Sequence, residues 1–104
     1  MLSDARRRPE AQIVPDSHFA LKRFDVMPTV LRIGPSRFHF YSEESNEPAH
    51  IHVRSPDGEC KFWLEPVRLA RNRGLAPRDV REAERLIFEH QELLIGRFHE
   101  YHNR

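Results

Sequence analysis

Four short segments of alternating side chains, all within residues 30–64, constrain the fold more than any other feature of this sequence. Apolar and polar residues alternate there with a period of two, which is typical of strands that bury one face of a sheet. The segments span residues 30–33, 37–41, 50–54 and 59–64. They are separated by turn-forming residues at 34–36 and 56–58 and by a polar loop at 42–48. The pattern predicts a four-stranded antiparallel meander.

The period changes after Pro66 to that of a helix. Residues 67–73 are predicted to form a short helix, with Pro66 near its first turn and Gly74 just past its end. A long helix is predicted from Pro77 to about Tyr101, because apolar side chains recur at spacings of three, four and seven. The predicted fold class is therefore α+β: a four-stranded antiparallel sheet followed by a short and a long C-terminal helix, with the long helix packed on one sheet face.

The first 26 residues show neither the period of a strand nor that of a helix. They hold a run of three arginines at residues 6–8 and two prolines, so we predict a flexible Arg-containing N-terminal extension over residues 1–26 and a single α+β domain over residues 27–104. The extension is either dispensable or a tether to nucleic acid or to a partner. The net charge of +1 is small, so any binding of nucleic acid must rest on local clusters of charge.

The length and the apolar runs exclude several classes of protein. A chain of 104 residues has room for one small domain. No apolar run approaches the roughly 20 residues of a membrane span, and the N-terminus lacks the apolar block of a signal peptide. The single Cys60 cannot form an internal disulfide. We therefore expect a cytoplasmic protein without a membrane partner.

Side chains alternate along a strand, so each predicted strand divides into two faces. The apolar face, expected beneath the long helix, holds Phe38, Phe40, Ile51, Val53, Cys60, Phe62 and Leu64. The opposite face holds Arg37, His39, Tyr41, His50, His52, Arg54, Glu59, Lys61 and Trp63. We expect this second face to be a solvent-facing surface of imidazoles, cations and aromatic rings. Its cross-strand pairs would stabilise a solvated sheet even if the face had no other role.

The same residue types fit chemistry on RNA. His50 and His52 are the candidate catalytic residues, because imidazole can accept or release a proton near neutral pH. The candidate phosphate- and RNA-binding residues are Arg37, Arg54, Lys61, Tyr41 and Trp63. The cations would bind phosphate and stabilise the transition state, and the aromatic rings would stack on bases.

A metal site is a rival interpretation of the His-x-His spacing. Two imidazoles on one strand can approach one zinc or iron ion, and His39 or Glu47 would supply a third ligand. Because no third and fourth ligands are clearly recognisable, we predict no metal and no other cofactor.

Several strings of this sequence are similar to those of a known family. They are Met27-Pro28-Thr29-Val30-Leu31-Arg32-Ile33-Gly34, Phe40-Tyr41-Ser42, Asn46-Glu47-Pro48-Ala49-His50-Ile51-His52-Val53, Lys61-Phe62-Trp63-Leu64 and Asn72-Arg73-Gly74. Together they resemble a small bacterial domain of unknown function, the series four-one-six-zero, over residues 27 to about 101. The sequence departs from the family pattern at Ala49, where a second proline is common, and at Ala76, where a capping serine is common.

The resemblance implies a growth-inhibiting toxin of a two-gene toxin–antitoxin module, neutralised by a cognate antitoxin protein that the adjacent gene encodes. It implies no catalytic residue. Our leading hypothesis is a bacterial toxin that acts on RNA as a metal-independent ribonuclease through His50 and His52. One alternative is a non-enzymatic module that binds its partner through the sheet face or an open edge strand. The other is a metal-binding protein.

Overall fold

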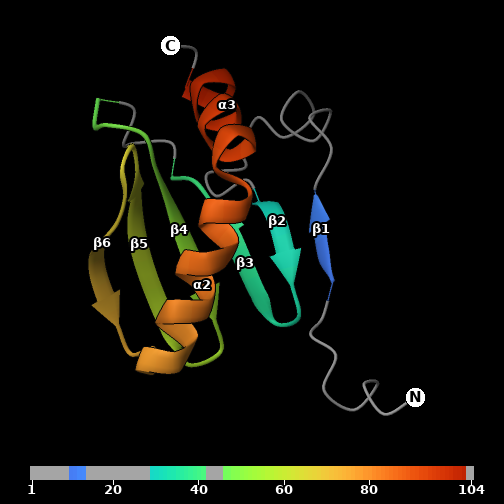
Figure 1. Cartoon of the computed structure of the whole chain (residues 1–104), viewed down its shortest axis with the longest axis vertical. Helices are drawn as coiled ribbons and strands as arrows, with labels where there is room; N and C mark the ends of the chain where they lie inside the picture. Colours follow the sequence, from blue (N-terminus) through green and yellow to red (C-terminus); the bar gives the residue numbers. More distant parts are fainter. Residues whose placement is uncertain (1–9, 14–28, 42–45, 103–104) are drawn as a thin grey trace.

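The computed structural model describes residues 10–13, 29–41 and 46–102, which form one antiparallel sheet and two C-terminal helices (Figure 1). The strands are β1 (Ala11–Ile13), β2 (Thr29–Ile33), β3 (Ser36–His39), β4 (His50–Ser55), β5 (Gly58–Leu64) and β6 (Val67–Arg73). The helices are α2 (Pro77–Glu89) and α3 (Gln91–His102). Each strand pairs with the next along the chain, so the sheet is a meander with the order β1-β2-β3-β4-β5-β6. The predicted α+β class is confirmed, but the described residues form six strands, not four.

The segment predicted as a short helix is the strand β6, so that prediction is wrong. Residues 65 and 66 form a two-residue turn, and β6 folds back on β5, with Lys61 opposite Arg71 and Glu59 opposite Arg73. The open edge of β5 needs hydrogen-bonding partners for its backbone, and this demand overrides a weak helical pattern. Gly58 makes the close pairing possible, because a Cβ atom there would clash with the carbonyl oxygen of Arg73.

The predicted N-terminal extension contains the edge strand β1. Ala11 lies opposite Ile33 and Ile13 opposite Leu31, so these residues extend the sheet beyond β2. Three residues are too few to show a period, which is why the sequence pattern does not reveal the strand. The rest of the predicted extension, residues 1–9 and 14–26, lies outside the described residues.

The predicted long helix is two helices that meet at His90. The backbone of His90 leaves the helical region, with φ −114° and ψ 23°, and its ring Nδ1 donates a hydrogen bond to the carbonyl oxygen of Leu86 at 2.9 Å. The backbone N–H of His90 still donates to the carbonyl oxygens of Leu86 at 3.1 Å and Ile87 at 3.2 Å, a shared bond that is common at helix ends. Gln91 then ties the start of α3 to the end of β5, because its Nε2 donates to the carbonyl oxygen of Leu64 at 2.6 Å.

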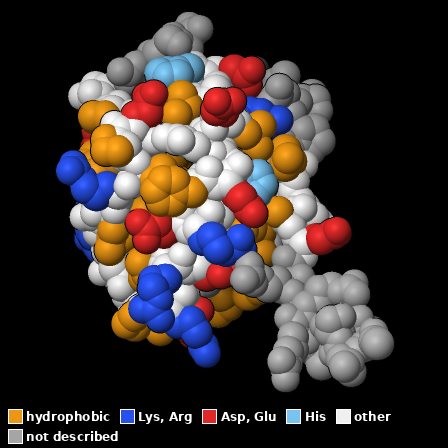
Figure 2. Space-filling model, viewed as in Figure 1, with side chains coloured by type: hydrophobic (Ala, Val, Ile, Leu, Met, Phe, Trp, Pro, Cys, Tyr) orange, Lys and Arg blue, Asp and Glu red, His pale blue; other side chains and the backbone are white. Residues whose placement is uncertain are grey.

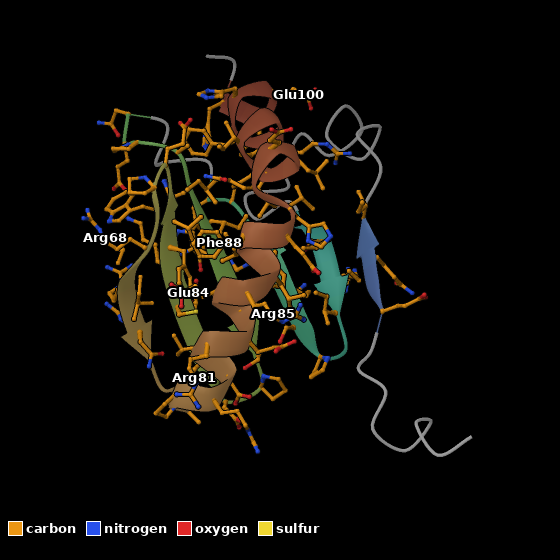
Figure 3. All side chains as sticks on the ribbon, viewed as in Figure 1. Arg68, Arg81, Glu84, Arg85, Phe88 and Glu100 are labelled. Atoms are coloured by element: carbon orange, nitrogen blue, oxygen red, sulfur yellow. The ribbon has the colours of Figure 1, made fainter. Side chains whose placement is uncertain are left out.

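The core lies between the helices and the predicted apolar face of the sheet. All seven residues predicted for that face are buried. Phe98 of α3 is fully buried and meets Phe40 edge to face at 5.6 Å between ring centroids. The outer side of α2 carries mixed charged and apolar side chains, among them Arg81, Arg85 and the exposed Phe88 (Figures 2 and 3). Neither described helix is long and apolar enough to cross a membrane.

Candidate functional site

The strand register collects the polar side chains of the second sheet face into rows across neighbouring strands. One row contains His39, His52, Lys61 and Arg71, and the next contains Arg37, Arg54, Glu59 and Arg73. A third row contains His50, Trp63 and Arg68. The structure thus places every predicted site residue of the strands β3, β4 and β5 on one face, together with three arginines of β6 that the sequence pattern missed.

This face does not present its histidines to solvent, so that expectation is wrong. His39, His50 and His52 are at most 2% exposed, and Lys61 is 7% exposed. Tyr41 lies edge-on to His52 at 4.4 Å, and Trp63 lies edge-on to His50 at 5.9 Å, both between ring centroids. A period of two tells which side of the sheet a residue occupies, but it does not tell how far its long neighbours cover it.

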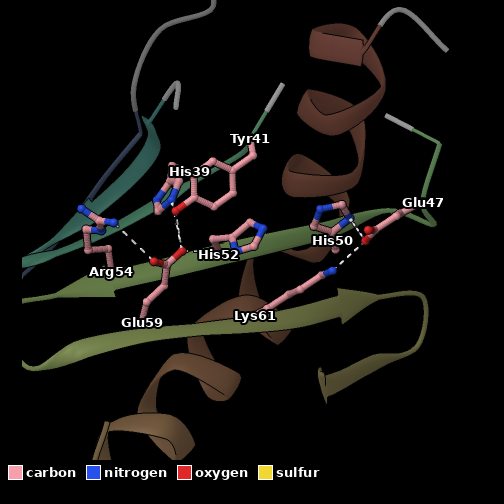
Figure 4. A network of polar contacts seen from close by, with 8 residues as sticks. All are labelled: His39, Tyr41, Glu47, His50, His52, Arg54, Glu59 and Lys61. Atoms are coloured by element: carbon pink, nitrogen blue, oxygen red, sulfur yellow. Dashed lines mark hydrogen bonds and ion pairs between the residues drawn. The ribbon is translucent and has the colours of Figure 1, made fainter. Parts of the chain in front are cut away.

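The carboxylate of Glu59 is the centre of the first polar cluster (Figure 4). Tyr41 donates its hydroxyl proton to Oε2 at 2.8 Å, and His52 Nδ1 lies 3.3 Å and His39 Nε2 3.6 Å from the same oxygen. Arg54 Nη2 donates to Oε1 at 3.4 Å. Burial alone would raise the pKa of Glu59, but the hydrogen bond from Tyr41 and the neighbouring cationic groups lower it. Glu59 is therefore a carboxylate at neutral pH.

A second carboxylate, Glu47, lies at the other end of the face. Lys61 Nζ donates to Glu47 Oε1 at 2.6 Å and lies 4.7 Å above the centre of the Trp63 ring. His50 donates from Nδ1 to the carbonyl oxygen of Pro48 at 2.8 Å, and the same nitrogen is 3.9 Å from Glu47 Oε1. The rings of His50 and His52 meet edge to face at 5.3 Å between centroids, so the two clusters are in contact.

A small pocket opens beside the Glu59 cluster. It measures about 120 Å³, and we call it the polar pocket; its lining is Tyr41, His52, Glu59, Cys60, Lys61, Arg71 and Arg73. Arg71 and Arg73 could have been found from the sequence only by reading their i, i+2 spacing as a strand. Cys60 is no nucleophile here, because burial and then the neighbouring Glu59 charge raise its pKa to about 12.

A larger hollow of about 710 Å³ lies on the opposite side of the sheet, against α2. Its floor is apolar, with Ile33, Phe38 and Leu86, and its lining includes no histidine and no lysine. None of the predicted site residues reaches it. We therefore place the candidate functional site in the polar pocket.

The described residues contain no group of three His, Cys, Asp or Glu side chains placed to hold a metal ion. Nδ1 of His50 is hydrogen-bonded to Pro48, and Nδ1 of His52 faces Glu59. The geometry therefore lends no support to the metal alternative, in which His39 or Glu47 would complete a His-x-His site.

The burial of His39 predicts that the stability of the fold depends on pH. Its Nε2 is buried without a hydrogen-bond partner, and burial lowers its pKa to about 4, although Glu59 opposes the shift. The unfolded chain has the ordinary value near 6.5, so between these values it binds more protons than the folded chain. We expect the free energy of unfolding to decrease by about 3 kcal/mol as the pH falls from about 6.5 to about 4. Denaturant unfolding at a series of pH values measures this loss.

Two variants separate His39 from the other titrating groups. His39→Phe should remove most of the pH dependence between 4 and 6.5, because phenylalanine cannot bind a proton. The exposed His99 is the control, and His99→Gln should leave the dependence unchanged. A wild-type stability that stays constant across this range would contradict the assignment.

Comparison with known proteins gives one match. Residues 36–99 match a family model whose description is Domain of unknown function (DUF4160), and this span includes all seven residues that line the polar pocket. The comparisons with curated proteins and with solved structures give no match. Because the matched residues are more than half of the chain, this protein belongs to the DUF4160 family.

Proposed function

We propose that this protein acts on RNA as a metal-independent ribonuclease. The observation that supports the proposal best is the polar pocket, in which His52 and its carboxylate partner Glu59 lie beside the cations Lys61, Arg71 and Arg73. A base held against several cations is the arrangement that phosphodiester cleavage needs, because the reaction moves a proton and builds negative charge on phosphate oxygens. The pocket is small, so it suits a phosphate group rather than a whole nucleotide.

His52 is the proton carrier of the proposal. The carboxylate of Glu59, 3.3 Å from Nδ1, favours the tautomer with its proton on Nδ1 and leaves the lone pair on Nε2. In the proposed reaction Nε2 takes the proton of the 2′-hydroxyl of the RNA, and the 2′-oxygen attacks the phosphorus. The bond to the 5′-oxygen breaks, and His52 returns the proton to that leaving oxygen, so the products are a 2′,3′-cyclic phosphate and a free 5′-hydroxyl.

His50 has a different position from His52. It does not line the pocket, and its Nδ1 is bonded to the carbonyl oxygen of Pro48, whereas His52 is a lining residue. We therefore propose that His50 supports His52 through their edge-to-face contact rather than exchanging protons with RNA. The sequence pattern, which places both histidines on one face, cannot distinguish these two roles.

The cations supply the charge that the reaction requires. Lys61, Arg71 and Arg73 line the pocket, and Arg54 lies behind Glu59. Guanidinium groups bind phosphate oxygens in pairs of hydrogen bonds and keep their charge at any physiological pH. Arg37 lies opposite Arg54 in the neighbouring strand and extends this charge along the face. The half-buried rings of Tyr41 and Trp63 offer surfaces on which flanking bases would stack.

The experiment is an RNA cleavage assay with the purified full chain, in the presence of EDTA. A fluorescent single-stranded RNA should be cleaved, and His52→Ala should lower the rate by at least about 100-fold, which is the usual contribution of a general base. His99→Ala is the matched control, because it removes an exposed imidazole that does not line the pocket. If folded His52→Ala cleaves RNA at the wild-type rate, the assignment of His52 is wrong.

We also propose that the protein is the toxin of a two-gene pair, which the resemblance to its family supports. Induced expression of the chain should then arrest the growth of a bacterial host, and co-expression of the adjacent gene should restore it. His52→Ala should not arrest growth if the arrest is caused by cleavage of RNA. Arrest by this variant at wild-type expression levels would favour the second candidate, a protein-interaction module whose toxicity needs no catalysis.

A further inference from the structure

The strand β6 is the outer edge of the sheet. It pairs with β5 on one side, and no described element lies along its other side (Figure 1). Residues 68–73 are all exposed. On the free side of such a strand, alternate residues direct backbone N–H and C=O groups to solvent, where another extended chain can pair with them.

The arginine side chains of β6 at positions 68, 71 and 73 all lie on one face of the sheet. Arg68, Arg71 and Arg73 lie opposite Trp63, Lys61 and Glu59, so all three belong to the polar face. The side chains of these three arginines make no hydrogen bond or ion pair with another described residue, and the side chain of Arg68 extends beyond the sheet edge (Figure 3). Leu69 lies on the opposite face and is 41% exposed. Unpaired cations on one side and an exposed leucine on the other form a pattern that a partner strand can match.

Charge decides which partner fits this edge. A second copy of β6, paired antiparallel, would bring six arginines together on one face, and like charges across a strand pair are destabilising. An acidic strand would instead place carboxylates next to the arginines. Arg71 and Arg73 lie two residues apart on the polar face, and the bulge at Ala70, where β6 has one residue more than β5, places Arg68 on the same face. A matching strand therefore carries acidic residues two positions apart, with apolar residues between them.

We propose that β6 binds an extended acidic segment of a partner protein, which adds a seventh strand to the sheet and pairs its carboxylates with Arg71 and Arg73. Because both arginines also line the polar pocket, the added strand would withdraw them from phosphate and inhibit the protein. This consequence for activity rests on the proposed function, whereas the docking itself does not.

The test uses the isotope-labelled full chain and three capped hexapeptides, with amide chemical shifts as the readout. The probe is Glu-Val-Glu-Val-Glu-Val. One control has the same composition in blocks, Glu-Glu-Glu-Val-Val-Val, and the other replaces each Glu by Lys. We expect the probe to shift the amides of residues 67–73 and to bind at least about tenfold more tightly than either control.

Charge-reversal variants test the role of the arginines. The double variant Arg71→Glu, Arg73→Glu should weaken binding of the probe at least about tenfold. The double variant Arg78→Glu, Arg81→Glu changes the net charge equally on the exposed side of α2 and should leave binding unchanged. If the first variant does not fold, the double variant Arg71→Gln, Arg73→Gln removes the two charges without reversing them. Its binding of the probe should still weaken severalfold.

Three results would overturn the proposal. Equal binding of the alternating and block peptides would show that no strand is added, and equal binding of the lysine peptide would exclude charge complementarity. Concentration-dependent shifts of the β6 amides without peptide would show that a second copy occupies the edge. All titrations are made without RNA, so a failure to cleave RNA leaves this test intact, and a failure to bind peptide leaves the cleavage assay intact.

Discussion

Glu59→Gln is expected to lower the rate of RNA cleavage by about 100-fold and to leave the affinity for RNA within about twofold. Glutamine keeps the shape of the side chain but removes the charge that faces His52 Nδ1 at 3.3 Å. The imidazole would then lose the partner that holds its proton on Nδ1, while the cations of the pocket would remain. Glu59 is thus a positioning residue, and the pH profile of cleavage should change with this variant.

The same variant should also weaken the fold. The hydrogen bond from Tyr41 at 2.8 Å is made to a charged acceptor, and Arg54 and two histidines face the same carboxylate. Losing that charge should cost about 2 kcal/mol of the free energy of unfolding. Glu92→Gln, on the exposed side of α3, is the control for both measurements. A Glu59→Gln protein with the wild-type cleavage rate and pH profile would contradict the role given to Glu59.

Phe98→Ala is expected to lower the free energy of unfolding by about 3 to 5 kcal/mol, which is the usual cost of removing a buried phenylalanine. Phe98 is fully buried, and its ring meets Phe40 at 5.6 Å and His50 at 5.3 Å. It therefore fixes α3 both to the apolar core and to the first histidine of β4. Without its ring we expect α3 to separate from the sheet and the enclosure of His50 to loosen.

Urea unfolding of Phe98→Ala and Phe88→Ala measures this effect against a matched control. Phe88 is 57% exposed on α2, so its loss should cost less than about 1 kcal/mol. Hydrogen exchange should show faster exchange in α3 for Phe98→Ala alone. If the two variants lose similar amounts of stability, α3 is not held by Phe98 as the packing indicates.

The sheet could be predicted from the sequence only where its strands are long enough to show a period and are bounded by turns. The strands β2 to β5 meet both conditions. β6 does not, because the arginines of residues 67–73 also suit a helix, and pairing with the open edge of β5 decides the outcome. The break at His90 is a local change of backbone angles at one residue, which the apolar spacing of the helix does not reveal.

Prediction of the site from the sequence meets the same limit. Alternation alone placed His50, His52 and Lys61 on one face, as the register of β4 with β5 confirms. It could not reveal that His39, His50 and His52 are enclosed, because enclosure depends on the reach of Tyr41 and Trp63. Alternation also could not show that Glu59 is the centre of a polar cluster. The sequence pattern is the same for a glutamate that faces water and for one whose carboxylate contacts two histidines.

The measurement that tests the proposed chemistry most directly compares two oligonucleotides of the same sequence, one all-ribose and one with a single 2′-deoxyribose before each cleaved bond. We expect the wild-type protein to cleave the all-ribose strand, to leave 2′,3′-cyclic phosphate ends detectable by mass spectrometry, and to spare the deoxy-substituted bonds. Cleavage of the deoxy-substituted bonds at a similar rate, or intact all-ribose RNA after prolonged incubation with folded protein, would contradict a ribonuclease that takes the 2′-hydroxyl proton with His52.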